Sequence, residues 1–262
     1  VQVALVDSST NGYGMWAGTT RPLFVGDNGW IYVYRQWAGE NTTHGQLGSA
    51  YSADGMGWTV YWNINLNGDP VWGGGGFGCG EPGSGTGGCA QARYPSALGN
   101  ADYPYAIWNE YTGYGTGYGG MPFYTWDEFG WDGGSWAVPQ FLDLMWGDWT
   151  TSNKDLWVGS PAHAYNAATG EDNFHVVYTD WTRNNYYLFS SEAYEDGLII
   201  FGPERIILDE QSCLLPGGAD GSYNSSPALS MAPNGSGMVG VIGFFATNAN
   251  GDDCDPTVNP EA

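Results

Sequence analysis

The chain has 262 residues and a formal net charge of −22, with 28 acidic and 6 basic side chains; 42% of its residues are hydrophobic and 16% aromatic. So few cations cannot build the basic face that nucleic-acid binding requires, and so many aromatic residues exclude a disordered acidic chain. No apolar run reaches the roughly 18 residues of a membrane span, the best being Met238–Ala246.

Short strand-like runs separated by Gly, Asn and Asp turns fill the chain, and this pattern predicts an all-β fold. Four prolines recur at intervals of 73, 66 and 66 residues, namely Pro22, Pro95, Pro161 and Pro227. Each is followed by a β-rich run, and these predicted strands are Trp30–Trp37, Tyr103–Tyr111, Phe174–Trp181 and Met238–Phe245. A further apolar run ends each of the first three units, at Trp58–Ile64, Trp136–Leu144 and Leu198–Leu208.

The repeats predict one domain, residues 1–262, built as a β-propeller-like series of four-stranded antiparallel blades. The approximate units are 20–92, 93–158, 159–224 and 225–262, and a β-sandwich is the alternative fold. The fourth unit lacks its outer strands, whereas residues 1–7 supply a spare one. Three explanations are open: a fragment of a longer propeller, a ring closed by that spare strand, or an edge completed by another chain's strand in a filament.

A shared box begins thirty residues after the first two prolines. Its members are Ser52, Asp54, Gly57 and Trp58 in the first unit and Thr125, Asp127, Gly130 and Trp131 in the second. We expect the hydroxyl and carboxylate to accept turn N–H groups, the glycine to take a positive φ and the tryptophan to pack between units.

These boxes resemble the Asp-box, or BNR, repeats of sialidase-like β-propellers, which also occur in large secreted bacterial surface proteins. The resemblance implies a propeller fold and export from the cell. It does not imply catalysis, because the boxes of that family lie away from the active site. Sialidases of the family would also require three arginines around a carboxylate and a Tyr/Glu nucleophile pair, and no residue here matches the nucleophile.

The candidate ligand-binding residues lie in and near the aromatic-polar-aromatic ends of the predicted strands. They are Arg35, Glu110 and Asp180, together with Arg21 and Arg93 beside the first two prolines. If those strand ends line a central channel, the first three face it together and bind a sugar or an ion; ordinary solvated polar positions are the alternative. As an acid/base pair for glycoside hydrolysis, Glu110 and Asp180 would have to lie about 5 to 9.5 Å apart.

Cysteines and a terminal acidic cluster complete the candidates. Cys79 and Cys89 flank a Gly-rich loop that could close as a disulfide, and Cys213 and Cys254 offer a second pair; four free thiols are the alternative. Asp252, Asp253 and Asp255 present the hard oxygen ligands that calcium prefers, with a plain acidic tail as the alternative and no other cofactor expected.

The sequence as a whole predicts a secreted or cell-surface protein with a structural or adhesive role and no catalysis of its own. We expect it to self-associate, by strand exchange, or to bind other cell-surface components. A glycan-binding module or a sialidase-like glycoside hydrolase is the alternative function.

Overall fold

The computed structural model describes residues 2–9, 20–36, 46–65, 92–111, 119–137, 140–142, 155–180, 186–208, 221–222, 227–234, 236–241 and 244–245. These residues form strands, turns and irregular segments. None of the described segments forms a helix suited to crossing a membrane.

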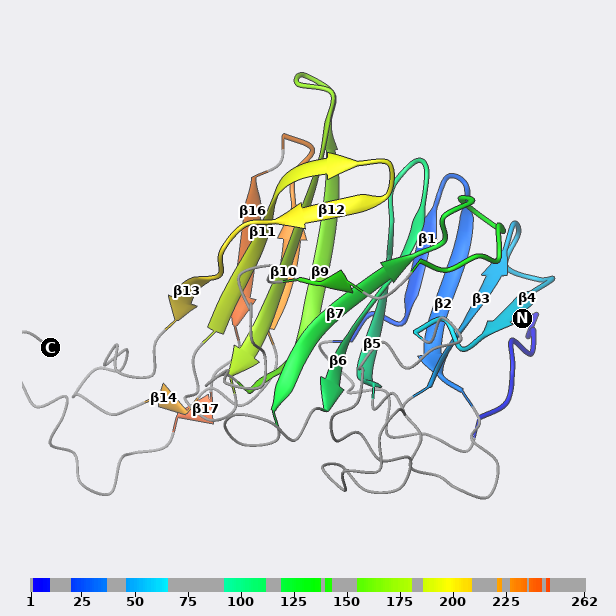
Figure 1. Ribbon diagram of the computed structural model, residues 1–262, viewed down its shortest axis with the longest axis horizontal. Coiled ribbons are helices and arrows are strands. Elements are labelled where there is room, and N and C mark those ends of the chain that lie inside the picture. Colours follow the sequence, from blue (N-terminus) through cyan, green and yellow to red (C-terminus); the bar gives the residue numbers. More distant parts are fainter. Residues whose placement is uncertain are drawn as a thin grey trace, which may run out of the picture.

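Successive antiparallel sheets stand side by side along the chain (Figure 1). The first contains β1 (Leu23–Gly26), β2 (Gly29–Arg35), β3 (Leu47–Ser52) and β4 (Thr59–Trp62) in that order. The second contains β5 (Ala92–Gly99), β6 (Pro104–Tyr111), β7 (Gly120–Trp126) and β8 (Gln140–Phe141). Chain order equals spatial order in both sheets, as in a propeller blade.

The third sheet repeats this order with β9 (Leu156–Asn166), β10 (Glu171–Asp180), β11 (Tyr186–Glu195) and β12 (Leu198–Phe201). Strand β13 (Arg205–Leu208) pairs with the other half of β11. The outer strand is therefore split in two, and Pro203, which has no N–H to donate, lies in the break. The fourth unit contains the pair β15 (Pro227–Met231) and β16 (Gly237–Val241), while β14 (Gly221–Ser222) pairs with β17 (Phe244–Phe245).

The sheets pack face to face because alternate residues of each inner strand point to opposite neighbours. In β6, Ala106 and Trp108 join the core between the first and second sheets. Tyr105 and Ile107 join the core between the second and third sheets. The second sheet is thus covered on both faces, which confirms the predicted all-β, propeller-like fold of four-stranded units over the sandwich alternative.

Hydrogen bonds join the four units around a common centre, through Arg21 just before β1 and through residues of β5, β9 and β15. The Arg21 N–H donates to Ser96 Oγ at 3.0 Å, and Ser96 Oγ donates to the Gly159 carbonyl at 3.3 Å. The Leu229 N–H donates to Ser160 Oγ at 3.4 Å, and the Arg21 guanidinium donates to the Leu229 carbonyl at 2.7 Å. The first unit is therefore connected directly to the fourth, so the units surround one centre.

Residues 2–9 lie outside every strand, and Val3 and Leu5 are 88% and 83% exposed. Asp7 accepts hydrogen bonds from the Tyr34 hydroxyl and from the Trp62 indole N–H. This segment therefore contacts the first sheet by side chains rather than as a strand. The closing role expected for residues 1–7 stays a prediction.

The first box forms a tight turn after β3. Ser52 Oγ accepts the Gly55 N–H at 2.8 Å, and Asp54 Oδ1 accepts the N–H groups of Met56 and Gly57 at 2.8 and 3.1 Å. The positive φ of 78° falls at Gly55, whereas the sequence pattern predicts it at Gly57. The Trp58 ring packs edge to face against the Trp30 ring, with ring centroids 6.4 Å apart. Trp58 thus packs within its own sheet and not, as predicted, between units.

The second box, after β7, uses the same residue types differently. Asp127 is 1% exposed and accepts the N–H groups of Phe129, Gly134 and Ser135 at 3.2, 2.5 and 3.1 Å. Gly130 has a φ of 83°. The Trp131 ring stacks on the Phe24 ring of the first sheet, with ring centroids 6.2 Å apart. The turn therefore also contributes to the packing between the first two units.

Candidate functional site

Strands β2, β6 and β10 all finish at the lower end of the sheets in Figure 1, and each has a buried charged residue at or next to its last position. Arg35 is 4% exposed there, and Glu110 and Asp180 are 0% exposed. Burying an ionised group costs free energy unless it is paired, and such groups concentrate at functional sites. The three residues therefore define the candidate site.

Arg35 and Glu110 lie near each other between the first and second sheets. Arg35 shares a strand face with Ile31 and Val33, whereas Glu110 shares one with Trp108, and the two faces pack together. Burial lowers the pKa of Arg35 to about 9; nearby Arg93 lowers this pKa further, and Tyr94 and Glu110 raise it. The Trp108 indole donates to Glu110 Oε2 at 2.9 Å, which orients the carboxylate.

Asp180 lies on the other side of the second sheet. It shares the face of Val176 and Tyr178, which pack in the core between the second and third sheets. Asp180 pairs with Leu156 across the β10–β9 ladder, and the Leu156 carbonyl accepts the Asn109 side-chain N–H at 2.6 Å. The three predicted residues thus share one end of the molecule but occupy two adjacent interfaces.

Sequence reasoning missed Asp155, Trp157 and Tyr94 at this end. Asp155 is 2% exposed, and its Oδ1 accepts the Gly120 N–H at 2.8 Å and the Trp157 indole N–H at 2.5 Å. The Tyr94 and Trp157 rings meet edge to face with centroids 6.0 Å apart. The available signal was a carboxylate directly before a predicted strand and an indole two residues later, a spacing that puts both on one face when the chain is extended.

The remaining candidates have different places. Arg93 is half-buried beside this group, and its Nη1 donates to the Ala92 carbonyl at 3.2 Å. Arg21 lies in the central hydrogen-bond ring. Within the described ranges, no group of three or more His, Cys, Asp or Glu side chains could hold a metal ion. The predicted disulfide and calcium residues lie outside the described residues: Cys79, Cys89, Cys213, Cys254, Asp252, Asp253 and Asp255.

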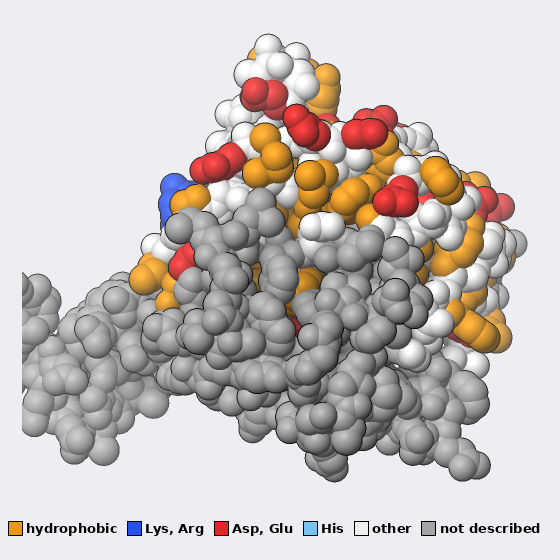
Figure 2. Space-filling view, viewed as in Figure 1, with side chains coloured by type: hydrophobic (Ala, Val, Ile, Leu, Met, Phe, Trp, Pro, Cys, Tyr) orange, Lys and Arg blue, Asp and Glu red, His pale blue; other side chains and the backbone are white. Residues whose placement is uncertain are grey.

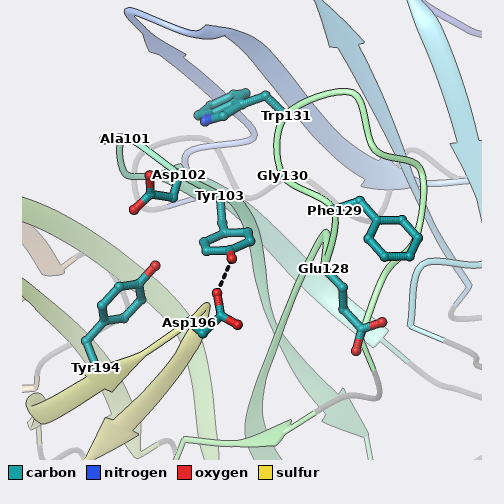
Figure 3. Close-up of a pocket in the computed structure, with 9 residues that line it drawn as sticks. All are labelled: Ala101, Asp102, Tyr103, Glu128, Phe129, Gly130, Trp131, Tyr194 and Asp196. Carbon is teal, nitrogen blue, oxygen red and sulfur yellow. Dashed lines mark hydrogen bonds between the residues drawn. The ribbon is translucent and has the colours of Figure 1, made fainter.

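An open cleft of about 680 Å³ lies at the opposite end, among turns of the second and third sheets (Figure 3). Tyr103 stands in its middle and donates a hydrogen bond to Asp196, with Tyr194 on one side and Glu128 on the other. This hydrogen bond, then burial and the Asp196 charge, raise the pKa of Tyr103 to about 12. Acidic side chains lie among hydrophobic ones over this upper region (Figure 2). The described residues of the lining offer hydrogen-bond acceptors, and none of them is cationic.

Comparison with known proteins found similarity in solved structures. An α-L-arabinanase from Penicillium chrysogenum is 12% identical, with a TM-score of 0.46, over 89% of this chain and 61% of its own. An endo-1,4-β-xylanase from Bacteroides thetaiotaomicron is 14% identical, with a TM-score of 0.40, and the match covers 74% of this chain and 61% of the xylanase. An exo-β-1,3-galactanase from Phanerochaete chrysosporium is 10% identical, with a TM-score of 0.35, over 95% and 64%. The chain therefore spans less than two thirds of each of these proteins.

No family model matches the chain, and no curated protein matches it. The structures named above are all glycoside hydrolases, a finding that contradicts the structural or adhesive role expected from the sequence. The physical reason for the error lies in the candidate site. The sequence predicts Glu110 and Asp180 as ligand-binding residues, with ordinary solvated positions as the alternative, and it gives no sign that both are fully buried beside further polar groups.

Proposed function

We propose that the chain is a glycan-active propeller protein that hydrolyses glycosidic bonds at the lower end of its sheets. One observation supports this most directly: Glu110, Asp155 and Asp180 are three buried carboxyl groups at the same end of neighbouring sheets. Glycoside hydrolysis commonly uses two carboxyl groups on either side of the scissile bond. A scaffold that only packs sheets has no need to bury so many there.

The surroundings of these carboxyl groups suit that chemistry. The Trp108 indole N–H donates a hydrogen bond to Glu110 Oε2 at 2.9 Å. The Trp157 indole N–H donates one to Asp155 Oδ1 at 2.5 Å. Such donors fix the direction of a carboxylate, and a fixed direction is needed for proton transfer or for attack on a sugar carbon. Arg35 places positive charge near Glu110, and Arg93 lies near Arg35.

A neutral polysaccharide is the substrate class that we propose. The net charge of −22 repels acidic chains, which argues against sialylated glycans. The names of the similar structures suggest arabinan, β-1,4-xylan and β-1,3-galactan as first substrates to try.

The test measures reducing ends released from these three polysaccharides. We expect Glu110→Gln and Asp180→Asn each to lower the rate by about 100-fold or more, because general acid–base groups contribute that much. Glu128→Gln, at the opposite end, is the matched control and should keep the wild-type rate. Glycan binding without release would indicate a binding module, and neither binding nor release would contradict the proposal.

We also propose that the protein works outside the cell and that its two boxes are variants of the Asp-box repeat. The acidic surface with a single lysine, Lys154, and the turn hydrogen bonds of Ser52 and Asp127 support these proposals. Thiol titration of the unfolded protein, before and after reduction, would measure the predicted disulfides. Four reactive thiols without reduction would argue against an oxidising compartment.

A further inference from the structure

Tyr94 has a backbone conformation that its residue type disfavours. Its φ is 51°, and the other described non-glycine residues with positive φ are Asn63, Asp132 and Asp196. Asn and Asp tolerate this region, whereas a bulky aromatic residue there is an outlier. Tyr94 also precedes Pro95, and a following proline favours a φ near −120°. The structure therefore holds Tyr94 in a strained conformation.

A β-bulge accompanies this strain. Arg93 pairs with Asn109 and Ser96 pairs with Ile107, so the two residues Tyr94 and Pro95 face the single residue Trp108. A bulge redirects a side chain relative to the regular ladder, and bulges are frequent beside active sites. Strain of this kind persists only where the surrounding structure over-determines it, and it clusters at functional positions.

The redirected ring lies at the junction of three units. Tyr94 belongs to the second sheet, meets the Trp157 ring of the third sheet, and raises the pKa of Arg35 in the first. It comes two residues before Ser96, which belongs to the central hydrogen-bond ring. It therefore lies between the Arg35–Glu110 group and the Asp155–Trp157 pair, and its side chain is only half-buried.

We propose that Tyr94 contacts the substrate and helps to determine specificity, holding a neutral sugar ring against its aromatic face between the carboxyl groups. This inference rests on the proposed function of the same site. A tyrosine ring offers a rigid apolar face for the C–H side of a sugar and a hydroxyl for hydrogen bonding. The bulge and the unfavourable φ are then features that aim this ring.

The experiment separates binding from folding by comparing variants. Tyr94→Gly removes both ring and strain, Tyr94→Phe keeps the ring, and Pro95→Ala relaxes the backbone while keeping the ring. The readouts are the melting temperature and KM on whichever of arabinan, β-1,4-xylan and β-1,3-galactan the wild type cleaves. Asp196→Gly, another positive-φ position at the far end, is the control for KM.

We expect Tyr94→Gly to melt at or above the wild-type temperature and to raise KM by about tenfold. Tyr94→Phe and Asp196→Gly should keep KM within about threefold of the wild type, whereas Pro95→Ala should raise KM, because a relaxed backbone no longer aims the ring. An unchanged KM in Tyr94→Gly would overturn the inference alone, as would an equal change of KM in the control Asp196→Gly. A wild type that cleaves and binds none of the three polysaccharides would overturn the proposed function and this inference together.

Discussion

Replacing Asp127 by alanine removes the acceptor that organises the turn after β7. Three backbone N–H groups, from Phe129, Gly134 and Ser135, donate to this carboxylate, whose side chain is 1% exposed. A hydrogen bond to a charged group contributes about 1.5 kcal/mol or more to stability. Burial raises the pKa of Asp127, which shows that desolvation offsets part of this gain. We therefore expect Asp127→Ala to lower the free energy of unfolding by about 3 kcal/mol.

Asp54→Ala is the matched control, because Asp54 has the same place in the first box but is exposed; it accepts the N–H groups of Met56 and Gly57 and, at 3.3 Å, the Ser52 hydroxyl. Asp54→Ala should lower the free energy of unfolding clearly less than Asp127→Ala does, since water replaces the lost acceptor at an exposed turn. Urea unfolding followed by tryptophan fluorescence measures both, with equal m-values as the condition for comparison. A loss under about 1 kcal/mol for Asp127→Ala, or equal losses for both variants, would refute the burial argument.

Three further predictions concern stability. Gly197→Ala should cost more than about 1 kcal/mol by urea unfolding, because Gly197 has a φ of 92° and its added Cβ would collide with the Trp126 ring; an unchanged midpoint would contradict this. Phe174→Ala should cost about 3–5 kcal/mol, since the ring is 0% exposed between two sheets, and a smaller loss would mean that the core can collapse. Burial raises the pKa of Tyr105 and Tyr124 above the ordinary value of 10.0. Above pH 10 the unfolded state therefore releases protons that the folded state keeps, so the free energy of unfolding should be constant below pH 10 and fall as the pH rises beyond it. Unfolding curves measured between pH 8 and 11 check this.

Most of the secondary structure could be predicted from the chain. The predicted strand Tyr103–Tyr111 corresponds to β6 (Pro104–Tyr111), and the predicted strand Trp30–Trp37 corresponds to β2 (Gly29–Arg35). Strand alternation and turn residues are local properties, so they are legible without any knowledge of packing. The recurring prolines and the two boxes are legible in the sequence for the same reason, and the unit boundaries drawn from them stay a prediction.

Other features depend on which strand faces meet. Arg35 and Glu110 come together only because odd-numbered residues of β2 and even-numbered residues of β6 face one another across an interface. Asp180 faces the next interface, and Arg21 belongs to a central ring of hydrogen bonds rather than to the candidate site. A one-residue change of register would exchange all of these faces, so residue type and spacing do not predict the contacts.

The burial of the carboxyl groups and the conformation of Tyr94 are also properties of the assembled molecule. Glu110 and an ordinary exposed strand-end glutamate look alike in a sequence, because burial depends on neighbouring sheets that are distant along the chain. The positive φ at Tyr94 contradicts the local preference before proline, so local rules predict the opposite conformation. Repeats, strands and turns thus follow from short-range patterns, whereas the site arises from long-range packing that overrides local preference.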